Sequence, residues 1–106
     1  MAKFLFETNY TATGAKGIVQ DGGTARRAVV AKLCESMGGK LESFYFAFGS
    51  TDVYVIVDLP DNVTAAAVAL AVNQGGGATV KTVVLIPPED LDKACKVAVD
   101  YRPPGR

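Results

Sequence analysis

The segment Phe44–Leu59 has the sequence FYFAFGSTDVYVIVDL and decides the fold of this chain. Two runs rich in aromatic and β-branched residues flank the short break Gly49–Asp52, a pattern that is typical of a β-hairpin. If residues 50 and 51 form a two-residue loop, Phe48 faces Val53, and the pairing continues along both strands. Because Ser-Thr suits such a tight turn poorly, we expect a longer loop that includes Gly49, which need not change which residues share a face. One face of the hairpin is then wholly apolar, which indicates that it lies against a hydrophobic core.

The rest of the chain supplies helices and two further strands around this hairpin. The expected elements, in chain order, are a strand over residues 3–10, a loop over 11–17 that leads into a short helical turn, a helix over 24–37 capped by Thr24, the hairpin, a helix over 63–72, a strand over 79–86 and a helix over 89–99. This order predicts an α+β, ferredoxin-like β-α-β-β-α-β sandwich, with helices on one face of an antiparallel sheet and an added C-terminal helix. We expect one domain over residues 1–100 and a flexible tail over 101–106.

The second face of the predicted sheet is too apolar to be left in water. It carries mainly hydrophobic side chains, namely Leu5, Tyr45, Ala47, Tyr54 and Ile56. Burying a large side chain of this kind contributes about 1.5–3 kcal/mol, and a second copy of the chain can cover such a face. Since isologous dimers are the commonest oligomers, we expect a homodimer closed sheet against sheet, which can assemble further.

The composition argues against several classes of function. The chain has 106 residues, with 11 Lys plus Arg against 11 Asp plus Glu, so it lacks the positive charge that favours nucleic acids and anionic membranes. It has no histidine, the usual general base near neutral pH and the commonest transition-metal ligand. Gly75–Gly77 follows a helix and lacks the Gly-Lys-Ser/Thr of a phosphate-binding loop. We therefore expect no metal and no cofactor.

The cysteines and the hydrophobic runs predict a cytoplasmic protein. Cys34 and Cys95 are the only cysteines and do not form a C-x-x-C pair, so we interpret them as free thiols in a reducing compartment, with a disulfide or a redox-active thiol as the alternatives. Glu7 interrupts the first apolar run too early for a signal peptide. No uncharged stretch reaches the roughly 18 residues that span a bilayer.

Several motifs together resemble the GYD-domain family. They are Leu41–Gly49 (LESFYFAFG), Asp52 at the start of a strand, Asp58–Asp61 (DLPD), the Ala-rich helix after Thr64, and Tyr10-Thr11 followed by Gly14. The likeness covers residues 3–88, but Thr51 stands where the signature Gly-Tyr-Asp has its tyrosine. The resemblance implies a ferredoxin-like fold of the dimeric α/β-barrel type, and it implies no particular activity.

Five residues are candidates for a ligand site: Gly49 and Asp52 from the signature, Arg26, Tyr10 and Tyr54. Each has a structural alternative. Asp52 can cap backbone N–H groups of the hairpin loop, and Arg26 can form an ion pair on a helix surface. The tyrosines can bury their rings and leave their hydroxyls in water.

Three hypotheses for the function follow. The first is a small-molecule-binding or regulatory homo-oligomer with a cleft near residues 49–52, for a small organic ligand. The second is a cofactor-free enzyme, an oxygenase or isomerase, of the kind that dimeric α/β barrels host, supported by fold analogy alone. The third is a purely structural oligomer. No catalytic residue can be named, so whether the protein is an enzyme stays open.

Overall fold

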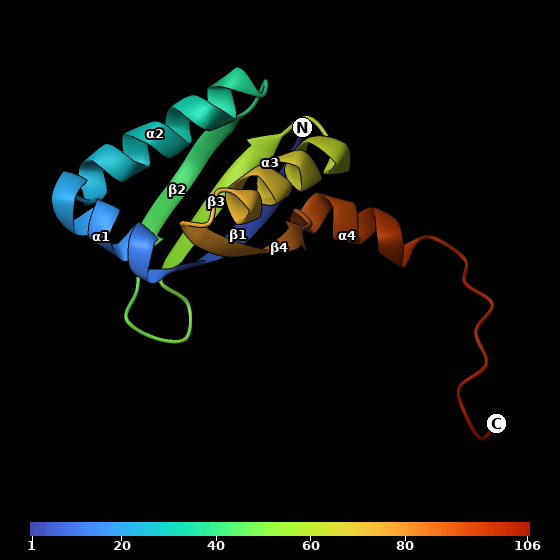
Figure 1. The fold of residues 1–106 in the computed structure, drawn as a ribbon. Helices are drawn as coiled ribbons and strands as arrows, with labels where there is room; N and C mark the ends of the chain where they lie inside the picture. Colours follow the sequence, from blue (N-terminus) through green and yellow to red (C-terminus); the bar gives the residue numbers. More distant parts are fainter.

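The computed structural model describes all 106 residues and shows the predicted α+β architecture (Figure 1). Its elements are β1 (Ala2–Tyr10), α1 (Ala12–Asp21), α2 (Gly23–Ser36), β2 (Lys40–Phe46), β3 (Val53–Leu59), α3 (Asn62–Gln74), β4 (Ala78–Leu85) and α4 (Pro88–Cys95). The four strands form one antiparallel sheet in the order β2-β3-β1-β4. This is the ferredoxin-like arrangement that the sequence predicts.

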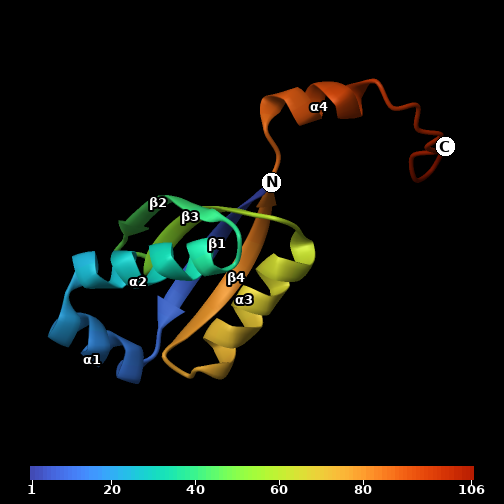
Figure 2. The ribbon, with the colours of Figure 1, turned by 90° about the horizontal axis from the view of Figure 1, so that it is seen from above.

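The core lies between the sheet and the helices α2 and α3, which cover the same face (Figures 1 and 2). Along β3 every second residue is buried, from Val53 to Leu59, because alternate side chains of a strand point to opposite faces. Phe4 and Phe6 of β1 complete the sheet side of the core, and Ala65 and Val68 of α3 pack onto it.

Helix α1 corrects the prediction of a loop over residues 11–17 leading into a short helical turn, because a continuous helix begins at Ala12. Thr11 is the N-cap of this ten-residue helix and accepts a hydrogen bond from the backbone N–H of Gly14 at 3.3 Å. Its hydroxyl also donates to the carbonyl of Gly76 at 2.8 Å. Glycines lower helix propensity, which is why the region reads as a loop. Gly14 is nevertheless needed here, since a Cβ on it would lie 1.9 Å from the carbonyl oxygen of Gly77.

Helix α2 begins earlier than predicted, with Gly22 instead of Thr24 at its N-cap. Gly22 closes α1 and opens α2, and its φ of +86° lies in a region that favours glycine. The sharp junction between the two helices therefore depends on backbone conformation instead of a side-chain cap.

The hairpin has the longer loop, including Gly49, that the sequence predicts. Phe46 lies opposite Val53, so the register is shifted by two residues from the one that pairs Phe48 with Val53. The N–H of Ala47 closes the loop onto the carbonyl of Asp52 at 2.8 Å. Ala47 is thus in the loop and not on the open sheet face. Ser and Thr suit a tight two-residue turn poorly, and an even shift keeps the aromatic residues facing the core.

The open sheet face carries the apolar side chains that strand alternation predicts, apart from Ala47. Leu5, Tyr45, Tyr54 and Ile56 are joined there by two residues of β4, Val83 and Leu85. Tyr45 and Tyr54 are 71% and 38% exposed. At one end of this face Lys3 forms ion pairs with Glu42 and with Asp58, the latter at 3.0 Å.

The C-terminal helix is shorter than predicted and does not pack on the domain. Helix α4 ends at Cys95, and it extends with the following residues away from the end of β4 (Figure 2). Every residue of α4 is exposed. None of the helices is long and apolar enough to cross a membrane.

Candidate functional site

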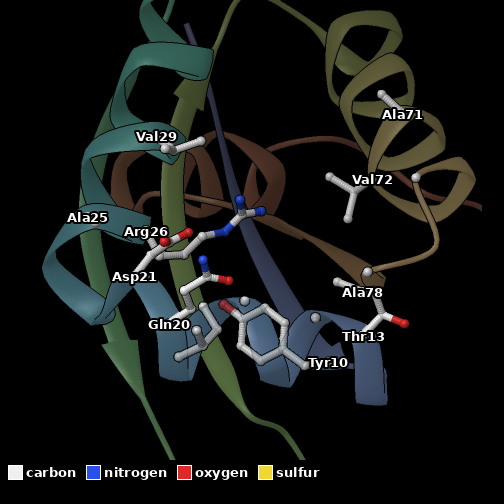
Figure 3. Close-up of a pocket in the computed structure, with 15 residues that line it drawn as sticks. Tyr10, Thr13, Gln20, Asp21, Ala25, Arg26, Val29, Ala71, Val72 and Ala78 are labelled. Carbon is white, nitrogen blue, oxygen red and sulfur yellow. The ribbon is translucent and has the colours of Figure 1, made fainter.

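A pocket of about 750 Å³ opens between α1, the first half of α2 and the end of α3 (Figure 3). This volume lies within the range of about 300–1,000 Å³ that is usual for small-molecule sites. Its floor is the end of β1 and the start of β4, represented by Tyr10 and Ala78. The pocket therefore lies on the helix-covered side of the sheet.

Arg26 of α2 is the only basic residue that lines this pocket. Its side chain is half-buried, and no carboxylate lies within 4.0 Å of it, so the ion pair considered from the sequence does not form. Figure 3 shows the guanidinium extending toward α3 and Val72, with the ring of Tyr10 below it in the view. Because burying a charge without a partner is unfavourable, an anion that binds beside this guanidinium would be stabilised.

Tyr10 contributes a phenol to the same pocket. Partial burial raises the pKa of this phenol above its ordinary value; the nearby guanidinium of Arg26 opposes that rise, and Asp52 adds to it. The hydroxyl is therefore neutral near pH 7 and can donate a hydrogen bond. The ring packs 6.5 Å from that of Phe46, which limits its movement.

Asp52 has a structural role, but its carboxylate binds the end of β1 and not the N–H groups of the hairpin loop that the sequence suggested. Its carboxylate accepts a hydrogen bond from the backbone N–H of Tyr10 at 2.9 Å. Its own N–H donates to the carbonyl of Thr8 and to Oδ1 of Asn9, both at 3.0 Å. Asp52 thus ties the hairpin loop to the end of β1 and orients Tyr10, but it does not line the pocket.

The remaining predicted site residues lie elsewhere. Gly49 is in the exposed hairpin loop, and Tyr54 is on the open sheet face. Thr51, which replaces the tyrosine of the family signature, is 9% exposed. Of the five candidates, the structure brings only Tyr10 and Arg26 together in the pocket.

Sequence reasoning missed the small and apolar residues that leave room for this pocket. Four glycines line it, Gly14, Gly17, Gly75 and Gly77, together with Ile18, Val29, Ala71 and Val72. The glycines are visible in the sequence, but a glycine cluster there suggests a phosphate loop before it suggests a pocket wall. Gly14 and Gly77 instead allow close backbone approach, since a Cβ on Gly14 would lie 1.9 Å from the carbonyl oxygen of Gly77. The N–H of Thr11 donates to the same carbonyl at 3.1 Å and holds α1 against the loop before β4.

A second, smaller cavity of about 60 Å³ lies deeper, between the sheet and the helices α2 and α3. Apart from Thr8 and Arg26, its lining is hydrophobic. Cys34 is part of this lining, and burial raises the pKa of its thiol, so the thiol is neutral. Cys95 is exposed and also free of any disulfide.

The arrangement suits recognition of an organic anion better than acid–base chemistry. A cation and a neutral hydrogen-bond donor face one space with apolar walls. The only carboxylate in the lining is that of Asp21, which is exposed at the rim. No group of three or more Cys, Asp or Glu side chains could hold a metal ion.

Comparison with known proteins places the chain in one family. No curated protein and no solved structure matches it significantly. The family model of the GYD domain matches residues 4–95, which is most of the chain. The chain therefore belongs to the GYD domain family.

Proposed function

We propose that this protein is a small-molecule-binding domain whose ligand is an organic anion held at Arg26. The observation that carries the proposal is the half-buried, unpaired guanidinium in a pocket of about 750 Å³. Arginine suits this role because its planar group can bind both oxygens of a carboxylate at once. The neutral hydroxyl of Tyr10 supplies a further donor, and the apolar walls supply burial for the rest of the ligand.

The open sheet face supports a homodimer, and dimerisation is compatible with this pocket. The pocket lies among the helices, whereas Leu5, Tyr54 and Ile56 lie on the opposite side of the sheet. A dimer closed through the sheets leaves both pockets accessible. A regulatory, homo-oligomeric binding domain therefore combines the two surfaces.

The alternatives receive less support from the same residues. A cofactor-free enzyme needs an acid or base beside the bound substrate, and the carboxylate of Asp52 instead accepts from the backbone N–H of Tyr10 and does not line the pocket. A purely structural oligomer does not require an unpaired arginine in an open pocket. Binding is thus the preferred function.

A thermal-shift series tests the proposal. Organic carboxylates and amines of equal size are compared at equal ionic strength, with the wild type, Arg26→Gln and Arg27→Gln. Arg27 is a matched control, because it is the next residue of the same helix, is exposed and does not line the pocket. A carboxylate at about 100 times its Kd should stabilise the wild type and Arg27→Gln by about 2.7 kcal/mol, and Arg26→Gln should lose this effect. Equal loss in both variants, or no stabilisation by any carboxylate, would overturn the proposal.

A further inference from the structure

The outer pocket and the inner cavity share three residues. Tyr10, Arg26 and Val72 line both spaces, so the charged group of Arg26 stands at the junction between them. On the outer side the lining includes polar residues and exposed positions. On the inner side it consists of core side chains such as Val30 and Val68. One small molecule could place a polar end at the junction and an apolar end in the cavity.

The size of the inner cavity limits what can enter. A cavity of about 150 Å³ holds benzene, so about 60 Å³ holds roughly two to three carbon atoms. The inner lining offers no second charge beyond Arg26, and an ionic group placed there would lose its hydration without a partner. The inner end of the ligand must therefore be a short hydrocarbon.

The charges of the lining favour a ligand with a single negative charge. Arg26 is the only cation among the residues around the outer pocket, and Asp21 at the rim adds a negative charge. A dianion such as a phosphate monoester would meet one cation and one like charge. A carboxylate matches the geometry of one guanidinium and one phenol donor.

We propose that the ligand is a small aliphatic carboxylate, whose carboxylate binds Arg26 and Tyr10 while a chain of two to three carbons passes Val72 into the cavity lined by Val30, Val68 and Cys34. This inference rests on the proposed function, since it specifies the ligand of the same pocket. Any further polar part of the ligand would lie in the outer pocket, which is large enough to keep it hydrated.

A homologous series measures the inner cavity directly. Acetate, propionate, butyrate, pentanoate and hexanoate are titrated at pH 7 and equal ionic strength, and binding is followed by the methyl and amide NMR signals of the protein. Burial of one methylene strengthens binding about fourfold. We expect this gain at each step up to butyrate and none beyond it. Butyrate should shift the methyl signals of Val68 and Val30, whereas acetate should leave them unchanged.

Two variants separate the tail from the head of the ligand. Val68→Ile adds one methylene to the cavity wall. In this variant the affinity should stop rising at propionate instead of butyrate, and the affinity for acetate should be unchanged. If that variant fails to fold, Val30→Ile repeats the test on the opposite helix. Arg26→Gln should weaken every member of the series by a similar factor.

The outcomes distinguish this inference from the proposed function. If carboxylates bind at Arg26 but their affinity does not depend on chain length, the inner-cavity inference is wrong and the anion site stands. The inner-cavity inference is equally wrong if Val68→Ile leaves the chain-length limit in place. If no carboxylate binds, or if Arg26→Gln binds all of them as the wild type does, both are wrong.

Discussion

Two glycines in α1, three residues apart, should respond oppositely to substitution by alanine. Gly→Ala within a helix stabilises by about 0.5–1 kcal/mol from propensity alone. A Cβ at Gly17 meets no atom within 4 Å, so Gly17→Ala should gain this amount in full. A Cβ at Gly14 would lie 1.9 Å from the carbonyl oxygen of Gly77, which is backbone and must move away.

The displacement caused by Gly14→Ala has a cost that the structure allows us to work out. Moving the loop before β4 breaks two hydrogen bonds of Thr11, one from its N–H to Gly77 at 3.1 Å and one from its hydroxyl to Gly76 at 2.8 Å. Each contributes about 0.5–1.5 kcal/mol net, so their loss costs about 1–3 kcal/mol. The gain in helix propensity is the same in both variants and cancels in their difference. Gly14→Ala should therefore be about 1–3 kcal/mol less stable than Gly17→Ala.

Urea denaturation of the two variants and the wild type measures this difference. The midpoint should rise for Gly17→Ala and fall for Gly14→Ala, with an unchanged slope. For a domain of this size, each 1 kcal/mol corresponds to a Tm shift of roughly 4–8 °C, so a thermal scan gives an independent value. A rise of equal size in both variants would show that α1 does not depend on close contact with the loop, and the wall of the pocket would then be wrongly described.

Three further predictions concern Asp52, the open sheet face and Tyr10. Asp52→Ala removes the acceptor of the Tyr10 N–H and should cost about 1–3 kcal/mol in urea denaturation; the exposed Asp92→Ala should change stability little, and similar values for both would exclude the proposed tie. Ile56→Lys should convert dimers to single chains in sedimentation velocity at micromolar concentration, whereas Val63→Lys on α3 should not; wild-type chains that stay single would refute the sheet-to-sheet dimer. Burial raises the pKa of Tyr10 in the folded state, so its contribution to stability is complete below about pH 10 and is lost as the pH rises through the folded pKa. The free energy of unfolding of Tyr10→Phe should therefore depend less on pH in that range than that of the wild type. Parallel plots of this free energy against pH for variant and wild type would contradict this assignment.

The strands and the two core helices could be predicted because their signals are local. Alternation along residues 3–10 predicts β1 and identifies Leu5 as a residue of the open face. Asp61 is of a residue type that favours helix N-caps, and its carboxylate accepts a hydrogen bond from the N–H of Thr64 at 2.8 Å at the start of α3. Such signals involve only a few neighbouring residues, so they can be recognised in the sequence without knowledge of the tertiary structure.

Helix α1 and the hairpin register could not be predicted in the same way. The glycines of α1 weaken its local signal, and contact with Gly77 supplies the reason why Gly14 is tolerated. The register of β2 and β3 depends on how the loop closes, and Asp52 fixes that closure through β1, a strand more than forty residues away in the chain. The sequence predicted only which face of the sheet each residue of β2 occupies, since any register shift by an even number of residues leaves Phe44 and Phe46 facing the core.

By itself, the sequence determined the fold class and the apolar side chains of the open sheet face, and it named Tyr10 and Arg26 among five candidate site residues without separating them from the other three. Only the tertiary structure decided that these two residues face one pocket, that Asp52 supports it from outside, and that Arg26 has no carboxylate partner. The physical reason is the range of the interactions. Periodicity and capping act between neighbours in the chain, whereas the pocket depends on contacts such as that between Thr11 and Gly76, which are 65 residues apart.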